Sequence, residues 1–379
     1  MIKKDLEVYP MKAIWSLLGS ALSVAALMAG EQQYRVLPAV TQGNLTVFPV
    51  VTGDTMADTK AFITLDEGIR AGEVVITETG GAQGLVRPRV ETNDGVLRES
   101  WPRIPRPIPP VMPNASVNEL SLINNSARPL LLLAGEIVTG GKQDRVVGKD
   151  RIIPAHSAPV ALGVFCVEPH RWTEMSAQFK TLGSTMAQPS VRAKALFAQN
   201  QQEVWNEVER SRNSFVATLP APAAAPVQQS SSYAVAMSSG AVQGEIDGVA
   251  KPIEQSFDAL IQHLRAENAV GAVVALHGEI IWADVFASGD LLNRYWPKLV
   301  RSYAAESFGY ARGVRFQKPP TVDDAQRFLD RVSGNHETVE SEPGLYRQTE
   351  IQGDNYRTFI LTSLLPGKAY MVHLAKMKE

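Results

Sequence analysis

The sequence predicts an α+β protein in which a β-rich, sandwich- or barrel-like N-terminal part precedes a helix-rich and β-hairpin C-terminal part. Short runs of Val, Ile, Leu and Thr separated by Gly, Asn and Pro fill residues 36–172, a pattern typical of sandwiches and barrels. The next segment of the sequence is rich in Ala, Gln and Glu and has apolar residues at helical spacing, which predicts helices. With 379 residues, 45% of them hydrophobic, the chain can bury a large core.

Residues 1–29 have the features of a secretory signal peptide. Lys12 precedes an uncharged stretch that ends in small residues near Ala29, the order of a positive region, an apolar region and a cleavage site. We therefore expect an exported protein, periplasmic or extracellular. The alternative is an uncleaved segment that anchors the chain in a membrane, because an apolar stretch of this length is at the lower limit of what spans a bilayer.

Strand signals and turns alternate through the N-terminal part. The runs LTVFPVV and EVVITE come first, and RPLLLLAGEIVT and APVALGVFCVE come later; β-branched and apolar residues bounded by Gly, Asn or Pro are typical of strands. Between these runs, residues 87–113 hold prolines too densely for a helix or a central strand. We expect a long loop or an extended arm there, laid over the surface.

A helical pattern occupies residues 173–215. Pro189 divides it, and Val191–Arg210 is the strongest helix of the prediction. Residues 219–249 are rich in Pro, Ala and Ser and poor in large apolar residues, which indicates a flexible excursion or a lid between two ordered parts.

The second ordered part, residues 252–310, is predicted as helix, hairpin and helix. The helices are Pro252–Glu267 and Leu291–Phe308, and the strands lie in VGAVVALHGEIIWADVFAS. Residues 311–379 are predicted as a separate C-terminal segment. It comprises one helix, Val322–Val332, and antiparallel strands whose Gly-Asp-Asn turn is a hairpin signal.

The composition excludes several functional classes. The single cysteine, Cys166, rules out an intramolecular disulfide and a zinc site built from cysteine pairs. The six histidines show neither HxH nor HExxH spacing, so we expect no metal and no cofactor. A net charge of −2, with both signs dispersed along the chain, gives no indication of a nucleic-acid partner.

The stretch LLLLAGEIVTGGKQDRVV, which begins at Leu130, places four polar side chains between two apolar runs. Gly140 and Gly141 let the backbone adopt positive φ and bring N–H groups toward a ligand. Lys142 and Arg145 could then hold a phosphate or a carboxylate. The sequence lacks the Ser or Thr that follows the lysine of a P-loop, and an exposed charged turn would have the same composition.

Two carboxylates in apolar strands are candidates for acid–base chemistry. Glu168 lies on a predicted strand, on the same face as Cys166 and His170, and is followed by Arg171, so a pocket there could hold an acid beside a cation. Asp284 shares a strand face with Trp282, and burial among apolar neighbours raises the pKa of a carboxyl group. The structural alternatives are an ion pair of Glu168 with an arginine in the core and a capped strand end at Asp284.

The segments LLLLAGEIVTGGKQDRVV, VFCVEPHRW, QNQQEVWNEV, DVFAS and KLVRSYAAE together resemble the ARPP domain, a family named for its association with ADP-ribosylglycohydrolase and rhodanese-phosphatase-superfamily proteins. The resemblance spans roughly Asn44 to Glu306, and we expect residues after Gly309 to lie outside it. The family name implies a contextual link to ADP-ribose or NAD-derived metabolism. The family pattern is similar at Gly135, Glu136, Gly140, Gly141, Lys142, Gln143, Arg145, Cys166, Glu168, Arg171, Trp172, Gln202, Trp205, Asp284, Phe286 and Tyr303.

These observations lead us to expect an exported protein that binds an anionic small ligand derived from a nucleotide or a sugar. Glu168 and Asp284 are the catalytic candidates if the protein is an enzyme, a question that the sequence leaves open. The alternative is a non-catalytic structural or protein-interaction module of the cell envelope, in which the same charges pair with one another. The predicted ligand-binding residues are Gly140, Gly141, Lys142, Gln143, Arg145, Arg171 and Trp172.

Overall fold

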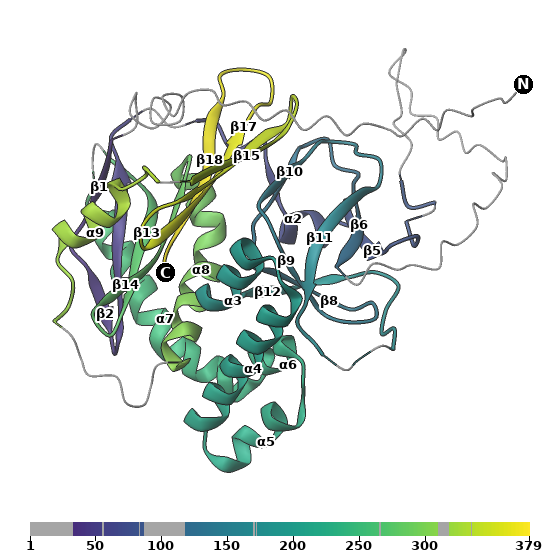
Figure 1. Cartoon of the computed structure of the whole chain (residues 1–379), viewed down its shortest axis with the longest axis horizontal. Helices are drawn as coiled ribbons and strands as arrows, with labels where there is room; N and C mark the ends of the chain where they lie inside the picture. Colours follow the sequence, from purple (N-terminus) through teal and green to yellow (C-terminus); the bar gives the residue numbers. More distant parts are fainter. Residues whose placement is uncertain are drawn as a thin grey trace, which may run out of the picture. The chain divides into compact units, whose positions relative to one another are not determined.

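In the computed structural model, the described residues fall within Gln33–Glu379 (Figure 1). The expected leader, 1–29, and the proline-dense arm, 87–113, lie outside the described residues. Among the helices that are described, none has the length and apolar composition needed to cross a bilayer. The structure describes residues 33–54, 57–82, 84–86, 118–169, 171, 173–264, 267–309, 318–334 and 336–379.

The largest sheet joins strands from both ends and from the middle of the chain. In the described residues it has nine strands in the antiparallel order β1-β3-β13-β14-β18-β17-β16-β15, with β2 paired to β3. Every residue of β3 is buried, which explains why its sequence, LTVFPVVT, is mostly apolar and carries no charge. The strands are β1 (Tyr34–Val36), β2 (Val40–Gln42), β3 (Leu45–Thr52), β13 (Asn268–Leu276), β14 (Glu279–Phe286), β15 (His336–Glu342), β16 (Tyr346–Gln352), β17 (Tyr356–Ser363) and β18 (Tyr370–Lys378).

Both predicted hairpins are confirmed. His277 and Gly278 join β13 to β14 with φ of 49° and 88°, and a two-residue turn with positive φ at both positions matches the twist of the flanking strands. The Gly-Asp-Asn turn joins β16 to β17, where the Gly353 N–H donates to the Tyr356 carbonyl at 2.9 Å. The local turn chemistry therefore fixed the strand pairing at both places.

The β-rich, barrel-like character predicted for the N-terminal part is confirmed by a six-stranded half-barrel in the order β12-β8-β9-β11-β6-β5. A three-stranded sheet, β10-β7-β4, lies in the same part of the chain. Apolar side chains such as Leu120, Leu162 and Phe179 form one buried cluster there. The strands are β4 (Ile63–Thr64), β5 (Val74–Glu78), β6 (Glu119–Asn124), β7 (Leu130–Leu132), β8 (Glu136–Thr139), β9 (Arg145–Val147), β10 (Arg151–Ile153), β11 (Val160–Cys166) and β12 (Lys180–Met186).

The predicted helical segment 173–215 is partly wrong. Its first regular element is β12, which pairs with β8, because pairing to an existing strand outweighs a weak helical pattern. The predicted helix Val191–Arg210 is divided into α3 (Pro189–Ala193), a π-helical turn (Lys194–Ala198) and α4 (Gln201–Thr218). Gln199, with φ of 47°, ends the π-helical turn, and the Asn200 side chain caps α4.

Residues 219–249, predicted as a flexible excursion, are helical instead. They contain α5 (Ala221–Gln229), α6 (Tyr233–Ser238) and residues 240–249 of α7, which spans Gly240–Ile261. Tyr233 and Ile246 are wholly buried in the main apolar cluster. The few large apolar side chains are spaced so that each helix has one buried face, and this burial stabilises a segment of otherwise weak pattern.

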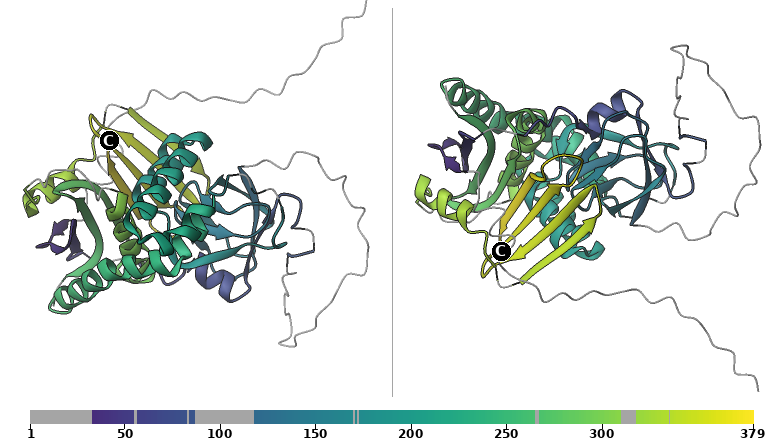
Figure 2. Two further views of the ribbon diagram at one scale, coloured as in Figure 1. Left: turned by 90° about the horizontal axis from the view of Figure 1, so that it is seen from below. Right: turned by 90° about the horizontal axis from the view of Figure 1, so that it is seen from above.

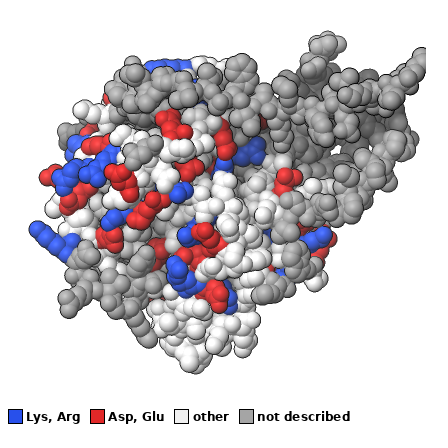
Figure 3. Space-filling model, viewed as in Figure 1, with Lys and Arg blue, Asp and Glu red and all other residues white. Residues whose placement is uncertain are grey.

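The remaining helices are α2 (Leu65–Arg70), α8 (Gly289–Gly309) and α9 (Val322–Asp330). Helix α8 contacts β12 of the half-barrel, β13 of the large sheet and α7. The C-terminal segment 311–379, predicted as separate, supplies β15–β18, which continue the sheet from β14 (Figure 2). The boundary expected near residue 310 therefore does not coincide with a break in the fold. On the face drawn in Figure 3, Lys and Arg side chains lie among Asp and Glu side chains.

Candidate ligand-binding site

The turn between β8 and β9 requires both of its glycines. Gly140 and Gly141 have φ of 125° and 49°, and a side chain on Gly141 would collide with the ring of Phe179 and come within 2.6 Å of the Glu78 carboxylate. That carboxylate accepts a hydrogen bond from the Lys142 N–H at 2.7 Å. The close approach of other parts of the half-barrel, as well as the positive φ, thus explains the glycine pair.

Arg171 also contacts this turn. We call the turn residues 140–145, together with Glu168 and Arg171, the corner. Its guanidinium donates to the Glu168 carboxylate at 2.6 Å and to the Asp144 carboxylate at 3.3 Å. It also donates to the carbonyls of Gly141 at 3.0 Å, Thr173 at 2.9 Å and Gly140 at 3.4 Å. Because these contacts use the nitrogens of the guanidinium fork, Arg171 holds the protein corner together and has little capacity left for a ligand.

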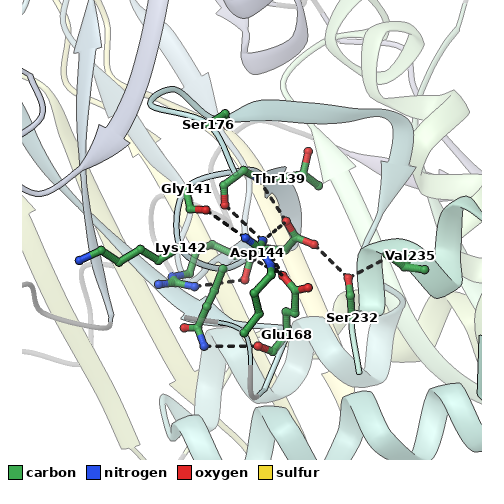
Figure 4. Close-up of polar contacts among 12 residues, drawn as sticks. Thr139, Gly141, Lys142, Asp144, Glu168, Ser176, Ser232 and Val235 are labelled. Atoms are coloured by element: carbon green, nitrogen blue, oxygen red, sulfur yellow. Dashed lines mark hydrogen bonds and ion pairs between the residues drawn. The ribbon is translucent and has the colours of Figure 1, made fainter. Parts of the chain in front are cut away.

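Asp144 and Glu168 are the two acids of the corner (Figure 4). Asp144 accepts from the Gly140 N–H at 3.1 Å and from the Ser232 hydroxyl at 2.9 Å, while its own N–H donates to Glu168 at 3.2 Å. Burial and the neighbouring Asp144 carboxylate raise the pKa of Glu168, although Arg171 opposes this shift. Glu168 therefore has the raised pKa that a general acid needs, but its carboxylate already accepts hydrogen bonds from Arg171 and from the Asp144 N–H.

The predicted cations of the corner are placed differently from Arg171. The Lys142 side chain extends away from Asp144 and Glu168 (Figure 4). Arg145 is 2% exposed, and the hydrogen bond of its side chain is a long one, 3.4 Å, to the Asp144 carbonyl. In the described part of the chain Arg145 forms no ion pair with a carboxylate, its Nε has no partner, and burial lowers its pKa.

Gln143 is the residue of the turn that faces a cavity. Its side chain is 0% exposed, its Nε2 donates to the Glu168 carbonyl at 3.3 Å, and its Oε1 has no hydrogen-bond partner. The cavity has a volume of about 550 Å³ and lies between this turn, α4 and the end of α5. We call it the Gln143 cavity; its lining residues are Gln143, Pro169, Gln202, Trp205, Asn206, Val208, Glu209, Arg212, Gln228, Gln229, Ser230 and Ser231.

Two further side chains of the Gln143 cavity have buried N–H groups without an oxygen or nitrogen acceptor. They are Trp205 Nε1, which lies near the weakly accepting sulfur of Cys166, and Arg212 Nε. Burial lowers the pKa of Arg212 and raises that of the Cys166 thiol. Unsatisfied buried polar groups are rare in folded proteins, and three side chains that have one, Gln143, Trp205 and Arg212, line this same cavity. Gln143, Gln202 and Trp205 are also among the positions that resemble the family pattern.

Asp284 belongs to a different cluster, so the structure does not bring it to the corner. It is 1% exposed and accepts from both terminal nitrogens of Arg192 at 2.9 Å, from Trp282 at 2.9 Å and from Tyr303. Burial alone would raise its pKa, but Arg192 and His373 hold the pKa well below its usual range. The expected raised pKa of Asp284 is therefore wrong, because partners from distant segments surround the carboxylate.

His373 connects this cluster to a second carboxylate. Its Nε2 lies 3.1 Å from Asp284, and its Nδ1 lies 2.6 Å from the equally buried Asp150. Burial lowers the pKa of the imidazole, but the two carboxylates raise it to about 9. His373 is consequently a buried imidazolium that donates from both nitrogens, and the cluster is a closed ion network without access from solvent.

Sequence reasoning missed several residues that shape these sites. Glu78, Ser232, Arg192 and His373 meet their partners across many intervening residues, so spacing gave no signal for them. Ser232 also caps α6 by accepting from the Val235 N–H at 3.1 Å (Figure 4), and a serine before a helix was a usable signal. Trp172, predicted as a ligand-binding residue, lies outside the described residues.

No group of His, Cys, Asp and Glu within the described ranges is arranged to hold a metal ion. A family model, described as the ARG and Rhodanese-Phosphatase-superfamily-associated Protein domain, matches residues 33–377. The match extends past the limit expected near residue 306 and includes the C-terminal strands. No curated protein and no solved structure gives a significant match.

Proposed function

The chain belongs to the ARG and Rhodanese-Phosphatase-superfamily-associated Protein domain family, ARPP-1, and we propose that it binds a small ligand in the Gln143 cavity. The ligand is an anionic compound derived from a nucleotide or a sugar. The observation that carries the proposal is the wholly buried Gln143, which lines a cavity of about 550 Å³ and whose Oε1 has no hydrogen-bond partner among the described residues. This volume is within the range of small-molecule sites.

Leaving a buried polar atom unpaired costs roughly 1–3 kcal/mol. A bound ligand that pairs with Gln143 and Arg212 recovers this free energy, because both have unpartnered polar atoms, and an oxygen acceptor would be a stronger partner for Trp205 than the Cys166 sulfur. The positions of Gln143 and Trp205 on a turn and a helix that are each fixed by other contacts supply the rigid scaffold that binding requires.

The anionic character of the ligand is supported by two guanidinium groups. Arg212 lines the Gln143 cavity with an unpartnered Nε, and the buried Arg145 lies close enough to Cys166 and Asp144 to interact electrostatically with both. A buried cation without a carboxylate partner is unfavourable. A ligand anion in the cavity would offset part of this cost for Arg212, the guanidinium that lines it.

Binding is a better supported function than catalysis. Glu168 is engaged by Arg171 and the Asp144 N–H, and Asp284 is enclosed in the Arg192 and His373 network. A general acid or base must reach its substrate directly or through one water. Of the two catalytic candidates, Glu168 is the one that lies beside the Gln143 cavity, through its carbonyl contact with Gln143.

A thermal-shift screen of the full chain against nucleotides, ADP-ribose, sugar phosphates and divalent metals tests the proposal. We expect an anionic ligand to raise Tm in the wild type and in Asn213→Ala, an exposed position on α4 outside the cavity. Gln143→Met should abolish the ligand-dependent shift; it removes both an unpaired acceptor and the long 3.3 Å hydrogen bond to the Glu168 carbonyl, two changes that oppose each other in the ligand-free Tm. A ligand shift that survives in Gln143→Met would contradict the proposed site.

A second candidate function is a non-catalytic structural or protein-interaction module of the cell envelope. The five contacts that Arg171 makes within the corner favour it. Under this function Glu168→Gln and Arg145→Ala lower Tm strongly, and no compound of the screen binds. Under the ligand-binding function Gln143→Met separates binding from stability.

We also propose that the chain is exported through residues 1–29. The support is the order of Lys12, an uncharged stretch and small residues near Ala29. N-terminal sequencing of the protein recovered from an expressing bacterium tests this, and a start near residue 30 is the expected result. Recovery of the intact N-terminus in the membrane fraction would instead support the anchored alternative.

A further inference from the structure

We infer that the Gln143 cavity recognises its ligand through a sugar ring with neighbouring hydroxyl groups, an inference that rests on the proposed ligand-binding function. The argument depends on which unpartnered groups donate and which accept. The Gln143 amide is oriented by its contact with the Glu168 carbonyl, because only the amide nitrogen can donate to a carbonyl oxygen. Its Oε1 is therefore an acceptor that needs a donor from the ligand.

The other two groups, one without a partner and one with only the weakly accepting Cys166 sulfur beside it, have the opposite requirement. Trp205 Nε1 and Arg212 Nε are donors, and the Arg212 Nη2 is already used by the Val227 carbonyl at 3.1 Å. A phosphate or carboxylate alone offers acceptors and would place a second oxygen beside Gln143 Oε1. A hydroxyl group both donates and accepts, so neighbouring hydroxyls can satisfy Gln143 and the two donors together.

The rest of the lining is suited to a hydroxylated ring. It contributes uncharged amides from Gln202, Asn206 and Gln228 and the hydroxyl of Ser230. The charged lining residues are Arg212 and Glu209, of opposite sign, so the cavity has one cation that can meet the anionic group of the ligand and is otherwise polar and neutral.

Trp205 provides an apolar surface within this polar lining. Its indole is half-buried on α4 and combines a flat face with a polar N–H. The C–H face of a sugar ring can pack on an indole while the hydroxyls at its edge reach the amides. The same chemistry is present in a free sugar phosphate and in the ribose of a nucleotide, and matched probes distinguish these two sources.

The experiment measures affinities of the full chain by titration calorimetry for AMP, 2′,3′-dideoxy-AMP, ribose 5-phosphate, adenine and inorganic phosphate. We expect the loss of the two hydroxyls from AMP to weaken binding at least tenfold. Gln143→Met should remove this difference, and Asn213→Ala should retain it. Binding of ribose 5-phosphate as tight as that of AMP identifies a sugar phosphate as the source, and weaker binding identifies a nucleotide.

Trp205→Phe is the second variant, and it keeps an aromatic face while removing the N–H. It should weaken the hydroxylated probes severalfold, with circular dichroism and Tm showing that the variant is folded. Equal affinity for AMP and its dideoxy analogue overturns the inference. If inorganic phosphate or adenine alone binds as tightly as AMP, the inference fails while the proposed function stands. If none of these probes and no compound of the wider screen binds, both fail.

Discussion

His373 is a residue whose charge is determined by its buried neighbours. It lies between Asp150 and Asp284, and both of these carboxylates are buried with it. Removing one partner of a buried ion network is costly because the others are left unpaired. The charge of the His373 imidazolium therefore contributes to the stability of the fold. Solvent does not reach the side chain, so nothing indicates a catalytic or ligand-binding role for it.

The first prediction concerns pH. The pKa of His373 rises from 6.5 to about 9 on folding, so its stabilising contribution is complete below pH 6.5 and is lost as the pH rises through 9. We expect a loss on the order of 3 kcal/mol in the wild type, and a smaller loss in His373→Gln. Burial lowers the pKa of Lys376 to about 7, which acts in the opposite direction over this range.

The measured quantity is therefore the difference in the free energy of unfolding between the wild type and His373→Gln, followed by urea denaturation from pH 6 to pH 10. Lys376 contributes equally to both proteins and cancels in the difference. Parallel pH profiles would show that His373 is not an imidazolium in the folded protein.

The second prediction concerns Glu306, which is buried on α8 and accepts from the Ser190 N–H at 2.9 Å. Burial raises its pKa from 4.5 to about 7, so the folded state binds the extra proton and stability falls as the pH rises from 4.5 to 7. Glu306→Gln removes this loss and should raise the stability at pH 8 by an amount on the order of 3 kcal/mol. At pH 4.5 the two proteins should differ little, and a lower Tm of the variant at pH 8 would refute this.

The candidate site was predictable where its residues are near in sequence or fixed by backbone conformation. The glycine pair, Gln143, Glu168 and Arg171 do meet, as two neighbouring β segments allow. The role of Arg171 was not predictable, because a sequence cannot say whether a guanidinium bonds to carbonyls of its own chain or to a ligand. Asp284 was misjudged because its partners Arg192 and His373 lie 92 and 89 residues away.

At the scale of elements, α4 depends on a defined start. The π-helical turn before α4 ends at Gln199, whose backbone is in the left-handed region. The Asn200 side chain then accepts hydrogen bonds from the N–H groups of Gln202 at 2.9 Å and Glu203 at 3.2 Å. These bonds satisfy donors that a helix leaves free at its N-terminus. Because α4 carries Trp205 and Arg212, its start also positions one wall of the Gln143 cavity.

The third prediction is that Asn200→Ala lowers the free energy of unfolding by about 1 kcal/mol. Asn200→Asp keeps the cap and should restore most of the loss. Thermal denaturation of both variants provides the measurement. An unchanged Tm in Asn200→Ala would mean that water replaces the side chain at no cost.

Elements with strong local signals were predictable, and elements made by tertiary contacts were not. The hairpin turns and the helices beginning near Gly289 and Val322 agree with the sequence pattern. Strand β12 and helices α5 and α6 differ from it, because their stability comes from pairing with β8 and from burial of side chains such as Tyr233 and Met237. Local composition describes neither contribution.

At the scale of the whole molecule, the C-terminal strands are part of the main sheet. Strand β18 lies between β14 and β17, and Leu374 and Ala375 are buried in it. An end segment that fills the interior of a sheet cannot be treated as an accessory, even though its sequence has the appearance of a separate unit.

The fourth prediction follows from this placement. A chain ending at Gly334 lacks β15–β18 and should show no cooperative unfolding transition, because β14 loses its neighbour and the core is opened. Circular dichroism and size-exclusion chromatography of the truncated chain are the measurements. The control is Val339→Asp on the exposed edge strand β15, which should unfold at nearly the wild-type temperature. A soluble, cooperatively folding truncation would restore the predicted boundary near residue 310.

The pairing of β3 with β13 has a consequence for biosynthesis. Leu45 pairs with Leu276 and Thr52 with Asn268, so an apolar strand made early by the ribosome waits for a partner synthesised more than two hundred residues later. Contacts of such long sequence separation slow folding, and an unpaired apolar strand promotes aggregation while it waits. The nascent chain therefore has a long interval in which β3 is a natural target for a holding chaperone, and the rate of translation becomes a determinant of yield.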